Sequence, residues 1–126
     1  MQSNNETCIP GISLSKKYGK IVVFRSTVQA LSEPKYIKFL INTEKGCLAI
    51  QACEKKILDS FRVPIYDSKE TEFRIYSDRL LGMLWKRYGW DSGYTYHMDG
   101  VRYPEHGIVE FNLNEAVQLL ETAVSE

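Results

Sequence analysis

The stretch of residues 16–52 constrains the fold most, because it predicts a strand, a short helix and a hairpin in direct succession. The β-branched and aromatic run at 21–24 is typical of a buried strand. Ser26 and Gln29 have the spacing of a capping box, in which two side chains satisfy free amides at a helix start. Two further β-rich runs flank Gly46, which tolerates the positive φ of a hairpin turn. The predicted element order is strand, helix, strand, strand (βαββ).

Residues 73–113 predict the same order a second time. A strand at 73–76 is followed by a helix with one apolar stripe, which Gly89 is placed to end as a left-handed cap. A second hairpin then joins 93–98 to 107–113. The turn glycine and alternating strand at 46–51 can be laid over those at 107–112, which predicts an internal repeat.

We therefore expect an α+β, mainly β fold in which two βαββ repeats form an intertwined, closed β-barrel. The 126 residues match one ordinary domain. Its expected parts, in chain order, are a flexible tail at 1–11 and then a single domain at 12–126, divided into repeat one at 12–53, a connector at 54–72, repeat two at 73–113 and a C-terminal helix at 114–126. The predicted apolar side of that last helix consists of Ala116, Val117, Leu120 and Val124.

Composition narrows the class of protein. The chain is 44% hydrophobic and 25% charged, as in a globular protein, and no apolar run approaches the roughly 18 residues of a membrane helix. The start of the chain lacks the pattern of a secretory signal, so we expect a cytoplasmic protein with no membrane partner. The three cysteines have no CxxC spacing, which argues against a zinc site, and we expect no cofactor or metal.

Charge is distributed unevenly along a chain whose net charge is zero. Residues 1–56 hold nine Lys/Arg against four Asp/Glu, and residues 57–126 hold seven against twelve. Four cations, Lys16, Lys17, Lys20 and Arg25, lie in a stretch without acids from 7 to 32. Such a cluster can neutralise phosphates, and an arginine can make a bidentate contact to a guanine edge. The alternative interpretation is ordinary solubilising surface.

The segment 16–51 resembles the AbrB/SpoVT swapped-hairpin domain. The resemblance rests on the run Gly19-Lys20-Ile21-Val22-Val23, which follows a basic approach, and on Leu31 at the end of the short helix. The second half fits as a divergent repeat, as in MraZ proteins, which carry two copies in one chain. The resemblance implies an intertwined homodimer that binds DNA and regulates transcription, here through Lys16, Lys17, Lys20 and Arg25.

Three departures from that family bear on DNA binding. Phe24 stands where the family has proline, and Ser32 replaces the glycine after the helix leucine. Val28 and Gln29 stand where relatives carry the basic helix residues that meet phosphates and base edges. The alternative hypothesis is therefore a protein-interaction module, or an inhibitory or accessory factor of a mobile element, that keeps the fold without binding DNA.

The acidic, aromatic second half is the expected contact surface under that alternative. Trp90 and Tyr103 are its candidate interaction residues, because both lie in turn-like contexts. Enzyme function is less well supported. His97 and His106 lie near Asp99 and Glu105, but their spacing matches no zinc helix, and no phosphate loop or nucleophile elbow is present in the sequence. We therefore expect a protein without catalytic residues.

Overall fold

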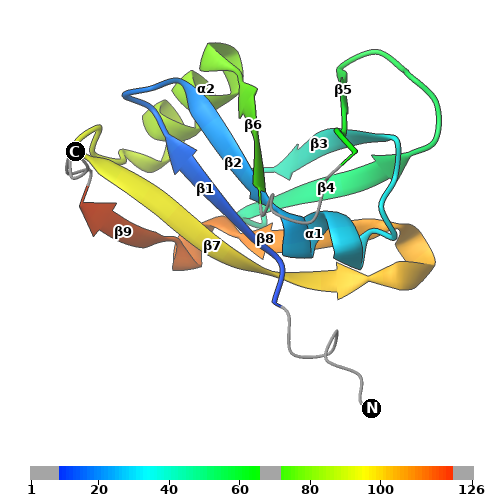
Figure 1. Ribbon diagram of the computed structural model, residues 1–126. Coiled ribbons are helices and arrows are strands. Elements are labelled where there is room, and N and C mark those ends of the chain that lie inside the picture. Colours follow the sequence, from blue (N-terminus) through cyan, green and yellow to red (C-terminus); the bar gives the residue numbers. More distant parts are fainter. Residues whose placement is uncertain (1–8, 66–71, 121–126) are drawn as a thin grey trace.

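The computed structural model describes residues 9–65 and 72–120. Nine antiparallel strands form a sheet that curls into a nearly closed, barrel-like shape with few helices (Figure 1). The strand order is β5-β3-β4-β8-β7-β1-β2-β6, and β9 pairs with β7 outside this path. The mainly β character predicted from the sequence is confirmed. Among the described residues, no helix is both long and apolar enough to cross a membrane.

The elements follow one another closely along the chain. The strands are β1 (Gly11–Ser15), β2 (Lys20–Phe24), β3 (Tyr36–Asn42), β4 (Cys47–Cys53), β5 (Ser60–Arg62), β6 (Glu72–Tyr76), β7 (Tyr94–Tyr103), β8 (Ile108–Asn112) and β9 (Val117–Leu120). The helices are α1 (Arg25–Ala30), α2 (Asp78–Tyr88) and the short 3₁₀ turns η2 (Pro104–His106) and η3 (Leu113–Glu115).

The long strand β7 joins the two parts of the sheet. Its first residues pair with β1 and β9, and its last four, from Gly100 to Tyr103, pair with β8. A Cβ atom on Gly100 would lie 2.6 Å from side-chain atoms of both Phe111 and Val109. Because those two side chains are fully buried, only glycine fits where β7 passes from one part to the other.

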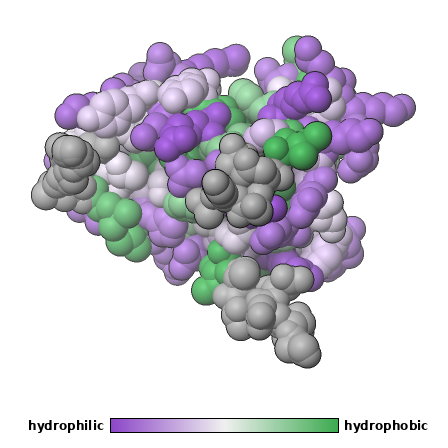
Figure 2. All heavy atoms as spheres, viewed as in Figure 1, coloured by the Kyte–Doolittle hydropathy of each residue, from purple (hydrophilic) through white to green (hydrophobic). Residues whose placement is uncertain are grey.

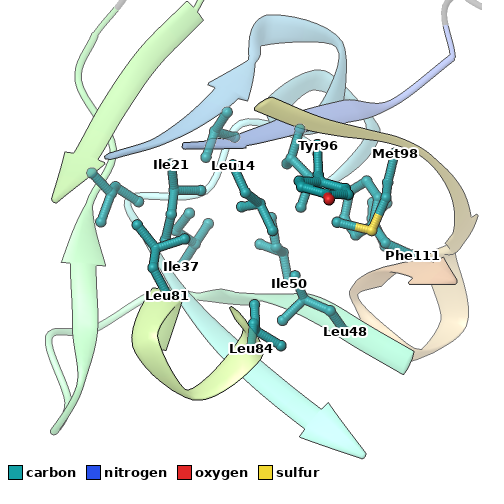
Figure 3. Packing of buried hydrophobic residues seen from close by; sticks show 14 of the residues in the cluster. Leu14, Ile21, Ile37, Leu48, Ile50, Leu81, Leu84, Tyr96, Met98 and Phe111 are labelled. Atoms are coloured by element: carbon teal, nitrogen blue, oxygen red, sulfur yellow. The ribbon is translucent and has the colours of Figure 1, made fainter. Parts of the chain in front are cut away.

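The core lies inside the curled sheet, where alternate residues of each strand point inward. Ile21 of β2 and Leu14 of β1 face Ile37, Leu48 and Ile50 of the opposite strands (Figure 3). Leu81 and Leu84 of α2 point into the same interior (Figure 3). Full burial of each such side chain contributes about 1.5–3 kcal/mol, so this cluster accounts for most of the apolar stabilisation.

Helix α2 follows the sequence prediction closely. The Ser77 hydroxyl accepts a hydrogen bond from the Leu80 amide at 3.3 Å, and Gly89 ends the helix in the left-handed conformation at φ 62°. Asp78 in the first turn and Lys86 and Arg87 in the last turn each have the charge that the helix dipole favours. The cap, the glycine stop and the apolar stripe are thus confirmed.

Helix α1 begins differently from the prediction. Its N-cap is Phe24, which has no polar side-chain atom, and the helix starts at Arg25. Ser26 is therefore inside the first turn, and the predicted capping box is wrong. The Thr27 hydroxyl in the same turn bonds to β1 and not to the helix amides: it contacts both backbone groups of Gly11 at 2.8 Å.

The N-terminal and connecting segments hold more strand than expected. Gly11 is buried and begins β1, so the predicted tail at 1–11 is too long, and its residues 1–8 lie outside the described part of the chain. Residues 11–24 form a two-stranded hairpin instead of a basic approach to one strand. The connector at 54–72 contains β5, and β6 begins at Glu72, while 66–71 lie outside the described residues.

The predicted helix at 114–126 is wrong over its described part. Residues 113–115 form a single 3₁₀ turn, and β9 then pairs with β7, with Val117 opposite His97 and Leu119 opposite Thr95. Strand pairing satisfies backbone groups of β7 that a helix would have left open, and the four residues VQLL are too few to favour either a strand or a helix. Residues 121–126 lie outside the described part of the chain.

The two halves supply partners to one another. Each has the order strand, helix, strand, strand, namely β2-α1-β3-β4 and β6-α2-β7-β8. Strand β2 pairs antiparallel with β6, and β4 pairs antiparallel with β8. That the halves are repeats of a common unit stays a prediction.

The exposed apolar side chains are scattered. On the face shown in Figure 2, hydrophilic side chains predominate among the described residues, and hydrophobic ones form small separate areas. Exposed apolar side chains include Val101 at 58%, Val117 at 55% and Leu119 at 47% exposure. Val101 lies on the outer face of the sheet formed by β3, β4, β8 and the end of β7.

Candidate nucleic-acid interface

Three of the four predicted DNA-binding cations gather at one turn. Residues 16–20, called the basic turn below, join β1 to the start of β2. The Nζ atoms of Lys17 and Lys20 lie 5.4 Å and 5.5 Å from the ring centroid of Tyr18. Both distances are within the range of a cation–π contact. The Tyr18 ring is 53% exposed and therefore carries two ammonium groups on an open surface.

The backbone of the basic turn is fixed against α2. Gly19 has a φ of 64°, and its amide donates to the carbonyl of Lys16 at 3.1 Å. The amide of Ser77, the N-cap of α2, donates to the carbonyl of Gly19 at 3.2 Å. A Cβ atom on Gly19 would lie 2.6 Å from the carboxylate of Asp78, so this acid faces the turn and offsets part of its positive charge.

A second exposed aromatic ring stands beside the basic turn. Tyr76 of β6 is directly opposite Lys20 of β2 and is 66% exposed. Two positions along β6, Arg74 is opposite Val22, and its guanidinium pairs with the Glu72 carboxylate at 2.9 Å. Lys20 and Tyr76 thus stand side by side on β2 and β6, next to the turn that holds Lys17. Lysines can neutralise phosphates, and the Tyr76 ring can pack against sugars or bases. Tyr76 was not among the predicted site residues, although it was predicted to lie between a strand and a helix start.

Arg25 does not share this surface. It follows Phe24 at the other end of β2, five residues from Lys20, which is on the order of 16 Å at roughly 3.3 Å per residue. There it lines a cavity of about 440 Å³ together with Lys35 and Arg62. We call this the cationic cavity. Lys35 and Arg62 were missed in the sequence analysis, because only the fold brings these distant positions together.

Trp90 and Tyr103 also lie apart. Trp90 is stacked on Tyr96, with ring centroids 4.4 Å apart and an interplanar angle of 11°, and meets Trp85 edge-on at 5.0 Å. It is partly buried against the core. Tyr103, 36% exposed, is seven residues beyond Tyr96 on β7, about 23 Å away at roughly 3.3 Å per residue. The two candidate interaction residues therefore do not form one surface.

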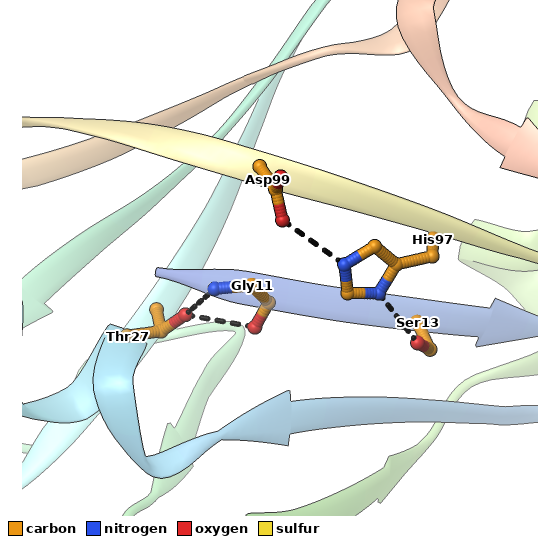
Figure 4. A network of polar contacts seen from close by, with 5 residues as sticks. All are labelled: Gly11, Ser13, Thr27, His97 and Asp99. Atoms are coloured by element: carbon orange, nitrogen blue, oxygen red, sulfur yellow. Dashed lines mark hydrogen bonds and ion pairs between the residues drawn. The ribbon is translucent and has the colours of Figure 1, made fainter. Parts of the chain in front are cut away.

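His97 takes part in a chain of hydrogen bonds on the outer face of the sheet (Figure 4). Its Nδ1 lies 3.1 Å from Ser13 Oγ, and its Nε2 lies 3.1 Å from Asp99 Oδ1. The Asp99 side chain is 67% exposed, so its ion pair with His97 is worth little in energy. His106 is at the far end of β7, in η2. We interpret the Ser13–His97–Asp99 chain as a link between β1 and β7.

Within residues 9–65 and 72–120, no three His, Cys, Asp or Glu side chains gather in a way that would hold a metal ion. Comparison of the chain with models of protein families, with curated proteins and with solved structures gave no match. Among the described surfaces, the basic turn has the most specific geometry.

Proposed function

We propose that this protein is a small DNA-binding regulator of AbrB-like type that contacts the DNA backbone through the basic turn. The observation that carries the proposal is the pair of lysine ammonium groups held around the exposed ring of Tyr18. Lysine side chains that are already ordered on a ring lose less conformational entropy when they bind phosphates than freely rotating side chains do. Their binding to DNA is therefore more favourable.

The electrostatics of the turn support this function. Lys16, Lys17 and Lys20 contribute three positive charges, and the Asp78 carboxylate offsets one of them. Each lysine that neutralises a phosphate releases a condensed counterion, so even three contacts add measurably to affinity at low salt. The exposed ring of Tyr76 supplies a contact that tolerates any base sequence.

The proposed surface differs from the one that the family resemblance implies. In α1, Val28 is buried and Gln29 is exposed, so the helix offers no cation at the positions where relatives carry them. Arg25 is the only cation of this six-residue helix, and it faces the cationic cavity. The resemblance rests on the sequence of 16–51, and in this proposal the turn takes the place of the helix as the contact surface.

Fluorescence anisotropy with a labelled duplex at 50 mM salt tests the proposal. The triple variant Lys16→Gln, Lys17→Gln, Lys20→Gln is expected to bind at least about tenfold more weakly than the wild type. A matched control removes three exposed lysines elsewhere, at positions 45, 55 and 56. The affinity of this control for DNA is expected to stay within about threefold of that of the wild type, because the three lysines contribute only long-range electrostatic attraction. Equal losses in the two variants would sink the assignment to the turn.

A second candidate function is self-association through the outer face of the sheet around Val101. The register aligns Leu40, Ala49, Glu110 and Val101 across four neighbouring strands, and Leu40 is 38% and Val101 58% exposed. Tyr103 is on the same face. Sedimentation velocity of the wild type and of Val101→Glu tests this surface: we expect a dimer that the charged variant converts to a monomer. A wild-type monomer at all concentrations would remove the candidate.

A further inference from the structure

The cationic cavity lies between α1, the start of β3 and the end of β5, away from the basic turn. Its lining residues are Arg25, Val28, Glu33, Pro34, Lys35, Tyr36, Arg62, Val63, Pro64 and Ile65. Its volume of about 440 Å³ is within the roughly 300–1,000 Å³ of pockets that hold small molecules.

Cations outnumber acids three to one among the residues that line this cavity. Arg25, Lys35 and Arg62 come from three different segments, whereas Glu33 is the one acid among the lining residues. The whole chain has zero net charge, so this excess is local. A cleft lined by one sign of charge concentrates ions of the opposite sign, and guanidinium groups bind phosphate oxygens in a bidentate way.

The backbone around the cavity is held in place on both sides. The Val63 amide donates to the Lys35 carbonyl at 2.9 Å, and Arg62 is directly opposite Tyr36 in the pairing of β3 and β5. On the other side, the Glu33 amide donates to the Val28 carbonyl at 2.9 Å. Lys35, Tyr36 and Arg62 therefore project from an ordered backbone, as a binding site requires.

The remaining lining is apolar. Val28 and Val63 are only 1% and 7% exposed, whereas Ile65 is 93% exposed. A ligand with an apolar or aromatic body would cover exposed apolar surface such as that of Ile65, and Tyr36 is among the lining residues available to stack on an aromatic ring. We call this apolar part of the lining the apolar wall. An inorganic anion would bind the cations but leave the apolar wall in contact with water.

We propose that the cationic cavity binds a small phosphate monoester with an apolar or aromatic body. The phosphate would lie between Arg25, Lys35 and Arg62, and the body would lie against the apolar wall. This site is separate from the basic turn, so the inference goes beyond the proposed DNA binding and is independent of it.

Isothermal titration of the full chain with phenyl phosphate, inorganic phosphate and phenol tests the proposal. Phenyl phosphate is expected to bind at least about tenfold more tightly than either of the other probes, because only it engages both the cations and the apolar wall. Arg62→Gln is expected to weaken phenyl phosphate binding by about tenfold or more, and Arg62→Lys by less, because lysine keeps the charge but lacks the guanidinium fork. Lys45→Gln, on the β3–β4 turn, is the control and should leave the affinity unchanged.

Thermal unfolding of each variant checks that the fold is kept. If Arg62→Gln does not fold, Lys35→Gln takes its place in the same titration. The proposal is overturned if phenyl phosphate binds no better than inorganic phosphate, or if Lys45→Gln weakens binding as much as Arg62→Gln. The triple variant of the basic turn should bind phenyl phosphate like the wild type, so failure at one site is distinguishable from failure at the other.

Discussion

The hydroxyl oxygen of Thr27 lies 2.8 Å from both the backbone nitrogen and the backbone oxygen of Gly11 (Figure 4). Thr27 is fully buried in α1, and Gly11 is the first residue of β1, sixteen positions earlier. The hydroxyl accepts from the amide and donates to the carbonyl, so one side chain satisfies two buried backbone groups. These bonds attach the short helix to the start of the sheet.

Replacement of Thr27 by valine is expected to destabilise the protein. Valine has nearly the same shape but makes neither bond, which leaves the Gly11 amide without this partner at a cost of about 1–3 kcal/mol. Urea unfolding followed by circular dichroism measures the loss. Thr27→Ser keeps the hydroxyl and should lose less, and a valine variant as stable as the wild type would contradict the role of these bonds.

Replacement of Gly100 by alanine is expected to cost about 1–3 kcal/mol, because the added methyl group meets fully buried side chains. Gly82 provides the matched control. It lies inside α2, and a Cβ atom there meets no described atom within 4 Å. Gly82→Ala should raise the free energy of unfolding by up to about 1 kcal/mol through helix propensity. Equal effects of the two substitutions would show that β7 does not pass Phe111 as closely as described.

The thiol of Cys47 is expected to titrate above its ordinary range. Burial raises the pKa of Cys47, and the charge of Glu110 raises it further, whereas Lys45 acts in the opposite direction. Glu110→Gln removes a negative charge that disfavours the thiolate, so the pKa should fall and alkylation by iodoacetamide at pH 8 should become faster. The measurement uses a background in which Cys8 and Cys53 are serine. An unchanged or slower rate would contradict the influence of Glu110.

Tyr96→Phe tests the strand that replaces the predicted C-terminal helix. The Tyr96 hydroxyl accepts hydrogen bonds from the Asp91 amide and from Gln118 Nε2 of β9, both at 2.9 Å. The ring is only 3% exposed, so loss of the hydroxyl should cost about 1–2 kcal/mol. Gln118→Leu removes one of the two bonds and should cost less. Equal stability of Gln118→Leu and the wild type would argue against the docking of β9 at this position.

The strands and helices that could be predicted from the sequence are those whose local residue preferences match the environment that the fold gives them. The run 21–24, the Ser77 cap and the Gly89 stop each have one strong local preference, and the structure follows all three. Strand β1 was not predicted, because its five residues form a short run and the lysine-rich segment that follows lacks the usual residues of a hairpin turn. Strand β9 was missed because the short run VQLL fits a helix or a strand, and pairing with β7 decides between them.

The candidate sites were harder to predict from the sequence than the strands and helices were. Lys16, Lys17 and Lys20 are neighbours in sequence, and the turn keeps them together. Arg25 seemed to belong with them, but residues 21–24 of β2 separate it from the turn, and it lines the cationic cavity instead. Lys35 and Arg62 join Arg25 only because β5 pairs with β3, a contact for which the sequence contains no local signal.

The salt dependence of DNA affinity tests the central claim most directly. The logarithm of the binding constant falls with the logarithm of salt concentration by about 0.9 for each phosphate neutralised on duplex DNA. Three lysines of the basic turn therefore predict that the slope between 50 and 200 mM salt is less steep by about 2.7 in the triple variant than in the wild type. The same slope in both proteins, or no binding by the wild type at 50 mM salt, would contradict DNA binding through this turn.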